Sequence, residues 1–298
     1  MKGWWCAGML GMAWLLPLQA QSDKYPGDMR SDVYFLANDS LQGRAPGTHG
    51  AQTAARWIAE RFQNLKLQPA FDHTYYQPFI YQESGQQIGT ENVLAQTNPN
   101  TPCRLIIAAH YDHLGFGEHH SREVFPNRIH NGADDNASGT AMLLELAKWY
   151  MKQDTLPGYN VLFVCFSGHE AGLFGSEFFV QHPPFPLDSS MFVLNFDMVG
   201  RLDTAQQMPP LYFRVPPESH WPSTMLPVSE NGLKVVVKNA EYPLDHTAFE
   251  RQNIPAATFS TGIHDDYHRS TDDADRINFT GMERILQYVK IFILELIR

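Results

Sequence analysis

The feature that most restricts the fold of this chain is a set of short apolar runs that alternate with helix-like stretches. Residues 105–109, 161–166 and 192–196 are apolar at almost every position rather than at every second one. That pattern is typical of strands buried on both faces of a parallel sheet. Helical periodicity in 48–65 and 137–150 separates these runs, so we predict an α/β fold with helices covering the sheet.

The length and composition fit one large domain. The chain has 298 residues, 43% of them hydrophobic, with no repeat or low-complexity linker. Its first twenty residues have the pattern of a secretory signal peptide: Lys2, an apolar stretch over 3–16, and Pro17-Leu-Gln-Ala20 as a cleavage site. We therefore predict a signal peptide at 1–20, one domain at 21–298, and a secreted or periplasmic protein.

The remaining elements are weaker in the sequence. We expect short strands at 235–237 and 256–259, and we place the Pro-rich stretch 203–232 in a lobe on the substrate side. Thr280 and Glu283 have the spacing of a capping box, which predicts the start of a C-terminal helix. The apolar run 291–294 in that helix is bordered by charges, so it indicates a buried packing helix rather than a membrane span.

Charge and cysteine content exclude several classes of partner. The formal net charge of −10 argues against nucleic acid, whose recognition needs a basic face, and no cluster of Lys or Arg suggests a membrane surface. Cys103 begins one predicted strand and Cys165 lies near the end of its neighbour. At ~3.3 Å per residue they are too far apart to bridge, so we expect two buried thiols.

Residues able to bind a cation gather at the ends of the predicted strands and in two loops. Each such segment alone has a structural explanation, such as a helix cap or a turn. Buried charges at several strand ends, however, need a partner of opposite charge, such as a cation. The carboxyl ends of strands in an open α/β sheet meet at one crevice, so these residues can share that partner. The segments are Ala109-His-Tyr-Asp-His113, Gly132-Ala-Asp-Asp-Asn-Ala-Ser-Gly139, Ser167-Gly-His-Glu-Ala-Gly172, Asn195-Phe-Asp197 and Asp265-Asp-Tyr-His268.

These motifs resemble those of the co-catalytic zinc aminopeptidases of the bacterial leucyl aminopeptidase type, a family that also contains glutamate carboxypeptidase and glutaminyl cyclase. The opening Leu41-Gln-Gly-Arg-Ala-Pro-Gly-Thr48 and the closing Asp266-Tyr-His-Arg-Ser-Thr-Asp-Asp273 resemble secreted members. The resemblance implies a three-layer αβα zinc-exopeptidase fold of the phosphorylase/hydrolase-like type, with a central, mostly parallel mixed sheet. It also implies a peptide substrate.

The resemblance further implies two Zn²⁺ ions that share a water or hydroxide. It assigns His110 and Asp197 to one ion, Glu170 and His268 to the other, and Asp134 as the carboxylate that bridges both. Three carboxylates nearly cancel the charge of two dications, which favours such a site in a partly buried crevice.

Three further features of the site follow from the same resemblance. Asp112 is expected to orient the imidazole of His110, and Asp272 that of His268. The peptide bond after the bridging aspartate is cis in the family, which here predicts a cis bond between Asp134 and Asp135. Tyr242 is either an oxyanion-stabilising group or a packing residue.

His169 departs from the family pattern, because active relatives have a glutamate there that serves as general base. Three interpretations stay open: His169 replaces the glutamate as base, zinc alone activates the water at a rate ~10²–10⁴-fold lower, or the protein binds peptides without hydrolysing them. We rank an active aminopeptidase above a non-catalytic zinc-binding protein. Glutaminyl cyclisation is a third and lesser hypothesis.

Other readings of the same residues are excluded or weaker. Leu173 occupies the position where a zincin helix needs its second histidine, which excludes that class. Ser138 and Ser167 do not lie in Gly-x-Ser-x-Gly, so a serine hydrolase has little support. The loop that carries His113, His119, His120 and His130 is expected to be solvated.

Overall fold

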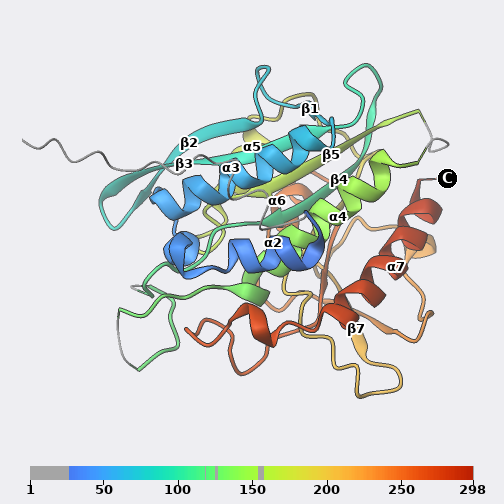
Figure 1. Cartoon of the computed structure of the whole chain (residues 1–298). Helices are drawn as coiled ribbons and strands as arrows, with labels where there is room; N and C mark the ends of the chain where they lie inside the picture. Colours follow the sequence, from blue (N-terminus) through green and yellow to red (C-terminus); the bar gives the residue numbers. More distant parts are fainter. Residues whose placement is uncertain (1–26, 118, 125–126, 154–157, 298) are drawn as a thin grey trace, which may run out of the picture.

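The computed structural model describes residues 27–117, 119–124, 127–153 and 158–297. The predicted signal peptide at 1–20 lies outside these residues. The described strands form one nine-stranded sheet in the order β1-β3-β5-β4-β6-β9-β7-β8, with β2 paired to β3 (Figure 1). The strands are β1 Gln68–Pro69, β2 Tyr76–Glu83, β3 Gln86–Gln96, β4 Cys103–His110, β5 Asn160–Phe166, β6 Phe192–Phe196, β7 Pro210–Val215, β8 Lys234–Asn239 and β9 Ala256–Ser260.

The centre of the sheet is parallel and its flanks are mixed. Strands β5, β4, β6 and β9 pair in parallel, as the uninterrupted apolar runs predict. The β2–β3 hairpin joins β5 antiparallel, and β7 joins β9 antiparallel, while β7 and β8 are parallel to each other. The carboxyl ends of β4, β5, β6 and β9 therefore meet at one edge, where ligands bind in folds of this kind.

Helices cover both faces of the sheet, which confirms the predicted three-layer α/β fold. One face packs against α2 Met29–Leu36, α3 His49–Asn64, α4 Gly139–Met151 and α7 Phe279–Leu296, and the other against α5 Phe174–Gln181 and α6 His246–Glu250 (Figure 1). Short helical turns lie at Asp39–Arg44, Ala133–Ser138, Ser223–Met225 and Ala274–Arg276.

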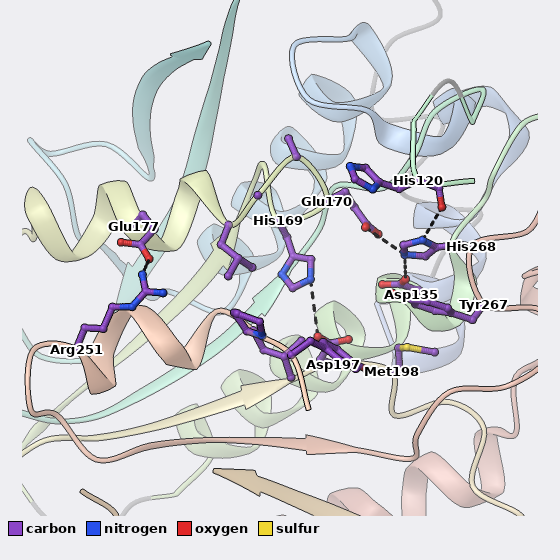
Figure 2. A pocket seen from close by; sticks show the side chains of 16 residues that line it. His120, Asp135, His169, Glu170, Glu177, Asp197, Met198, Arg251, Tyr267 and His268 are labelled. Atoms are coloured by element: carbon purple, nitrogen blue, oxygen red, sulfur yellow. Dashed lines mark hydrogen bonds and ion pairs between the residues drawn. The ribbon is translucent and has the colours of Figure 1, made fainter. Parts of the chain in front are cut away.

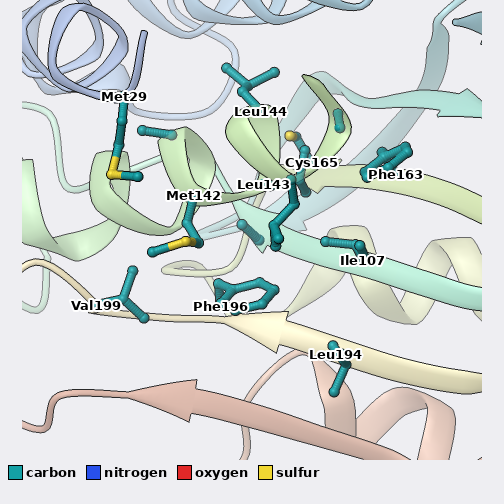
Figure 3. Close-up of a cluster of buried hydrophobic side chains, with 14 of the residues drawn as sticks. Met29, Ile107, Met142, Leu143, Leu144, Phe163, Cys165, Leu194, Phe196 and Val199 are labelled. Atoms are coloured by element: carbon teal, nitrogen blue, oxygen red, sulfur yellow. The ribbon is translucent and has the colours of Figure 1, made fainter. Parts of the chain in front are cut away.

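Successive side chains of each central strand enter different apolar clusters. Ile107 of β4 belongs to the cluster under α4, beside Phe163 and Met142 (Figure 3), whereas Ile106 belongs to the cluster under α5 and α6. Both are almost fully buried. Because the strands are packed on both faces, they are apolar at every position. The same packing holds the strands in place, and with them the site residues at their carboxyl ends.

Two sequence-based expectations about the fold are wrong in detail, and one hairpin was not expected at all. The α7 helix is capped by Asn278, whose side chain accepts a hydrogen bond from Gly281 N, and not by Thr280. Segment 203–232 contributes β7 to the sheet and does not line the cavity described below. The β2–β3 hairpin was not predicted, because polar residues and Pro78 interrupt its alternation.

The predicted state of the two cysteines is confirmed, since Cys103 and Cys165 are buried free thiols. Burial raises the pKa of Cys103 to about 12. Among the described residues, no helix combines the length and the hydrophobicity that a membrane span requires.

Candidate metal centre

The predicted convergence of the strand ends is present. His110 is the last residue of β4, Glu170 lies in the turn after β5, and Asp197 directly follows β6. His268 comes from the loop after β9, and Asp135 from the turn before α4. All except His110 line a cavity of about 480 Å³, in which Figure 2 shows them pointing toward one another.

Asp135, and not Asp134, lies between the two histidines. Its Oδ1 is 3.3 Å from Nε2 of His110, and its Oδ2 is 3.3 Å from Nε2 of His268. The two oxygens of one carboxylate thus face the two halves of the cluster. The predicted position of the bridging carboxylate is therefore wrong by one residue, as is the cis peptide bond, which joins Asp135 to Asn136.

Asp134 points away from this cluster into the protein. Its Oδ1 accepts hydrogen bonds from Ser138 Oγ at 2.9 Å and from Gly200 N at 2.6 Å, and its Oδ2 lies 3.0 Å from Nε2 of His264. Neighbouring residues of an irregular turn project in different directions, so only one of the two adjacent carboxylates can reach the histidines. Asp134 holds the turn that carries Asp135.

Both histidines present Nε2 to the cluster. Nδ1 of His110 lies 3.2 Å from the carbonyl oxygen of Asp112, and Nδ1 of His268 lies 2.9 Å from that of His120. A carbonyl only accepts, so each Nδ1 carries a proton, and Nε2 is the ring nitrogen that each histidine turns toward the carboxylates. This is the tautomer that binds a metal ion.

The ionisable groups of this cluster are buried and shift one another's pKa values. Burial lowers the pKa of His268, but hydrogen bonds to Asp135 and Glu170 outweigh this and raise it to about 10. Burial raises the pKa of Glu170, but contacts with His113 and His268 outweigh it and lower the pKa. Burial raises the pKa of Asp197 to about 6, against the opposing effect of His110. The carboxylates thus favour a positive charge among them.

Asp112 holds the turn after β5 with its carboxylate and the ring of His110 with its carbonyl oxygen. Its Oδ1 is 3.7 Å from Nδ1 of His110, whereas its two oxygens each accept a backbone N–H, from His169 and from Glu170, at 3.2 Å. The expected contact of Asp112 with the ring of His110 is present, and the nearer acceptor is the carbonyl oxygen of Asp112 rather than its carboxylate. The carboxylate of Asp112 fixes the backbone of His169 and Glu170.

Asp272 differs from the expected role. One of its oxygens accepts from the backbone N–H groups of Asp134 and Asp135, at 2.9 and 3.0 Å, and the other lies 3.3 Å from Nη2 of Arg201. It therefore supports the turn that carries Asp135 and does not contact the ring of His268. Burial raises its pKa to about 7.

His113 belongs to the site, although the sequence indicated a solvated loop residue. It is buried, and its Nδ1 lies 2.8 Å from Oε1 of Glu170, which leaves Oε2 of that carboxylate 3.2 Å from Nε2 of His268. His130 is buried as well, between Ser121 and the carbonyl of Arg128. Only His119 and His120 are exposed, as expected.

His169 is held by a carboxylate from a distant part of the chain. Its Nδ1 lies 2.8 Å from Oδ2 of Asp245, its Nε2 lies 4.0 Å from Oδ2 of Asp197, and its ring stacks on His110 with centroids 3.7 Å apart. Burial lowers the pKa of His169, but the charge of Asp245 outweighs it and raises the pKa well above its ordinary value. Ligand atoms of His110, His169 and Asp197 lie within 4.8 Å of one another.

The cavity beside the cluster has aromatic and apolar walls. Tyr267 stacks on His268 with centroids 3.8 Å apart, and Tyr242 accepts a hydrogen bond from Nη1 of Arg214 at 3.2 Å. At the end opposite His268, Arg251 forms an ion pair with Glu177 (Figure 2). Tyr242 thus lines the cavity and is fixed by a buried arginine, in agreement with either of its two predicted roles.

A mixed sheet whose parallel strand ends bring two histidines and three carboxylates together is typical of a metal-dependent hydrolase. Comparison with known families gives the narrower assignment. The model of peptidase family M28 matches residues 92–293, and the chain belongs to this family. The predicted family and the predicted class of enzyme, a zinc metallopeptidase, are confirmed.

Three curated relatives show how widely the family varies. The chain is 29% identical to the alkaline phosphatase isozyme conversion protein of Escherichia coli over 174 residues, covering 56% of this chain and 49% of the relative. It is 24% identical to bovine glutaminyl-peptide cyclotransferase over 85% of this chain and 78% of the relative. It is 24% identical to aminopeptidase YwaD of Bacillus subtilis over 70% of this chain and 45% of the relative. The chain thus spans about half the length of the first and third of these proteins.

Solved structures share the fold at low sequence identity. A glutaminyl cyclase of Porphyromonas gingivalis superposes with a TM-score of 0.73 at 18% identity, over 90% of this chain and 97% of that one. A Zn-dependent exopeptidase of Parabacteroides distasonis superposes with a TM-score of 0.71 at 18% identity, over 89% and 98%. These likenesses support the αβα zinc-exopeptidase architecture.

Proposed function

We propose that this protein is a secreted aminopeptidase that uses two Zn²⁺ ions. His110 and Asp197 would hold one ion, Glu170 and His268 would hold the other, and Asp135 would serve both. The observation that carries the proposal is the position of Asp135, whose two oxygens lie 3.3 Å from Nε2 atoms of different histidines. A carboxylate with one oxygen near each of two histidines suits a site for two metal ions.

The residues present fit such ions. Nε2 of His110 and Nε2 of His268 are buried and face carboxylate oxygens at 3.2–3.3 Å. Such a contact between ring nitrogen and carboxylate is stabilised either by a proton on Nε2 or by a cation bound to both groups, and a metal ion would take the place of the proton. Two imidazoles and three carboxylates are also a ligand set that Zn²⁺ prefers.

His169 is the group we assign as general base. Asp245 accepts a hydrogen bond from Nδ1–H of His169, so Nε2 is the ring nitrogen directed toward Asp197 and the cavity. Two dications bound nearby would favour the neutral ring over the charged one, and in this neutral form Nε2 accepts a proton from the attacking water and passes it to the leaving amine. When bound, the zinc ions make that water more acidic and polarise the scissile carbonyl.

The surrounding residues position this chemistry. Asp112 fixes the backbone of His169 and Glu170 together, so the base and a metal ligand move as one unit. Asp272 does the same for the turn of Asp135 through two backbone hydrogen bonds. The aminopeptidase assignment is supported by the relative from Bacillus subtilis, and secretion is supported by the sequence of residues 1–20.

Two measurements on the native protein test the proposal. Elemental analysis should give two zinc ions per chain, and aminoacyl anilides should be hydrolysed in a reaction that a chelator stops. The His169→Glu variant separates the interpretations of the base. Hydrolysis by the native chain supports His169 as base, activity in the variant alone indicates a decayed catalyst, and inactivity of both with two zinc ions bound contradicts the peptidase proposal.

Glutaminyl cyclisation is the second candidate. The match to bovine glutaminyl-peptide cyclotransferase covers more of both chains than the match to the aminopeptidase. In that reaction the terminal amine attacks the side-chain amide of glutamine and releases ammonia, so no peptide bond is broken. Ammonia release from a glutaminyl peptide without release of free glutamine would favour cyclisation over hydrolysis.

A further inference from the structure

Among the five proposed metal ligands, only His268 has a left-handed backbone, with φ of 57°. Residues other than glycine rarely adopt this conformation, because Cβ is crowded by the neighbouring carbonyl oxygen. Such a conformation persists only where contacts from the surrounding structure hold it. The loop after β9 that carries His268 therefore depends on support from another part of the chain.

The support comes from residues 119–124, which we call the strap. In sequence the strap lies between β4 and the turn at Ala133–Ser138. Arg122 N donates to the carbonyl of His268 at 2.9 Å, and the carbonyl of His120 accepts from Nδ1 of His268 at 2.9 Å (Figure 2). The guanidinium of Arg122 also lies 6.0 Å from the ring centroid of Tyr267. The strap thus contacts both the backbone and the ring of His268.

Glu123 is the side chain that extends the grip of the strap beyond His268. Its Oε1 accepts from the backbone N–H of Ser270 at 3.0 Å and from the hydroxyl of Ser270 at 2.9 Å. The hydrogen bonds from Ser270 lower the pKa of Glu123 below its ordinary value. The loop is therefore held at two points, at His268 by the backbone of the strap and at Ser270 by the carboxylate.

These contacts bear on the metal centre because of what the held residue does. Nε2 of His268 lies 3.2 Å from Oε2 of Glu170 and 3.3 Å from Oδ2 of Asp135, and this position depends on the left-handed backbone that the strap holds. We propose that Glu123 is a positioning residue for the ion that Glu170 and His268 would bind, and that it acts by holding the loop of His268 through Ser270. The inference rests on the two-ion site proposed above.

The contact should affect one ion of the pair and not the other. His110 ends β4 and Asp197 directly follows β6, so the packed centre of the sheet holds both of these ligands. His268 stands in a loop instead. Loss of Glu123 should therefore lower the affinity for the ion at Glu170 and His268, whereas the ion at His110 and Asp197 should remain bound.

Two substitutions of Glu123 separate the contact from the charge. Glutamine keeps an Oε1 that can accept both hydrogen bonds from Ser270, whereas alanine keeps neither. In competition with a zinc chelator, we expect Glu123→Ala to lower the affinity for one of the two ions about tenfold, and Glu123→Gln about twofold or less. The affinity for the other ion should stay within about twofold in both variants. Equal losses in the two variants, or equal losses for the two ions, would overturn the proposal.

Substitutions of Ser270 test the route by which Glu123 acts. Ser270→Ala removes the hydroxyl but keeps the backbone N–H, so it should weaken binding of the same ion by less than Glu123→Ala does. Ser270→Thr keeps the hydroxyl and should bind zinc as the native chain does. In the double variant, Ser270→Ala should add nothing to the loss caused by Glu123→Ala. Losses that add would contradict the route through Ser270.

Glu218→Ala is the matched control, because Glu218 is an exposed glutamate in the segment between β7 and β8. It removes the same charge and should leave both affinities unchanged. When zinc is added back to the metal-free enzyme, Glu123→Ala should need about tenfold more free zinc for half-maximal activity, with kcat at saturating zinc within about twofold of native. The same demand for zinc in the control would overturn the proposal, as would a lower kcat at saturation.

Hydrogen exchange keeps this inference separate from the proposed function. If the native protein binds two zinc ions but hydrolyses no peptide, the aminopeptidase proposal fails while the affinities still test Glu123. If it binds fewer than two ions, the two-ion site fails, but the hold of the strap on the loop is testable in the metal-free protein. A peptide spanning 264–272 should exchange its amide hydrogens faster in Glu123→Ala than in the native chain, and at the native rate in Glu123→Gln. Native exchange in both variants would overturn the inference.

Discussion

The carboxylates of Asp134 and Asp135 are adjacent in the chain but contact different histidines. Asp135 faces His110 and His268 with its two oxygens, whereas Asp134 faces His264 on the protein side of the turn. One turn therefore supplies both a group for the metal centre and a group that anchors the turn itself. The two roles can be separated by substitution.

Asp135→Asn should remove the metal bridge. An amide offers one neutral oxygen where the carboxylate offers two charged ones, so we expect fewer than two zinc ions per chain and a fall in kcat of about 10²-fold or more. Asp134→Asn is the control, because an asparagine there still accepts from Ser138 and Gly200. Elemental analysis and initial rates measure both effects. Loss of zinc from the Asp134 variant alone would reverse the assignment.

Asp245→Asn should lower activity by acting on His169. The charge of Asp245 raises the pKa of His169, so its removal lowers that pKa and extends the proton-accepting form to lower pH. A histidine of lower pKa is a weaker base, so we expect kcat to fall by up to about 10²-fold. The acidic limb of the kcat/KM profile should move to lower pH, because His169 stays unprotonated there. A pH profile that keeps its acidic limb in the variant would contradict the role of His169 as base.

His113→Ala should weaken zinc binding without altering any proposed ligand. His113 holds one oxygen of Glu170, and loss of such a partner typically costs ~10–100-fold in metal affinity. His130→Ala is the comparison, since His130 is also buried but contacts Ser121 and a backbone carbonyl instead. Competition with a zinc chelator measures both variants. Equal affinities for the two would show that the contact with Glu170 has no effect on the metal.

The pH dependence of stability should include a contribution from His246. Burial lowers its pKa to about 4, and Nδ1 lies 2.7 Å from Oγ1 of Thr258. Because its ordinary pKa is 6.5, the unfolded chain binds a proton between pH 6.5 and 4 that the folded chain does not, so stability falls as pH decreases through this window. The loss is up to about 3 kcal/mol at pH 4.

His246→Asn should flatten this part of the stability profile. Urea unfolding of the metal-free protein at several pH values between 7 and about 4 gives the two slopes, and excess chelator excludes effects of metal release. The variant is expected to be less stable at pH 7, since it loses the contact with Thr258. Parallel profiles for the two proteins would mean that other groups cause the decline.

The sequence predicts the central strands well because burial on both faces leaves a continuous apolar run. It does not predict β2 and β3, whose faces are partly solvent-exposed and whose alternation is interrupted by Pro78. The positions of His110, Glu170, Asp197 and His268 follow from their motifs. Asp134 and Asp135 have the same chemistry at adjacent positions, so motif spacing cannot distinguish them, and only the backbone of the turn decides.

The partners of His169 and Glu170 depend on tertiary structure. Asp245 reaches His169 from a segment 76 residues away, so no local pattern marks the contact. His113 stands in the same motif as His110 and Asp112, and this proximity was the one signal for its involvement. That signal was outweighed by three other histidines in the loop, two of which are exposed.

The five groups around the centre come from segments between His110 and His268 that meet only when β4, β5, β6 and β9 lie side by side. A chain in which any one of these strands has not joined its neighbours lacks part of the coordination sphere. Ions held there add their binding free energy to the cooperative unfolding of the entire sheet rather than to one loop. The supply of metal would then set the lifetime of the folded enzyme as well as its rate of turnover.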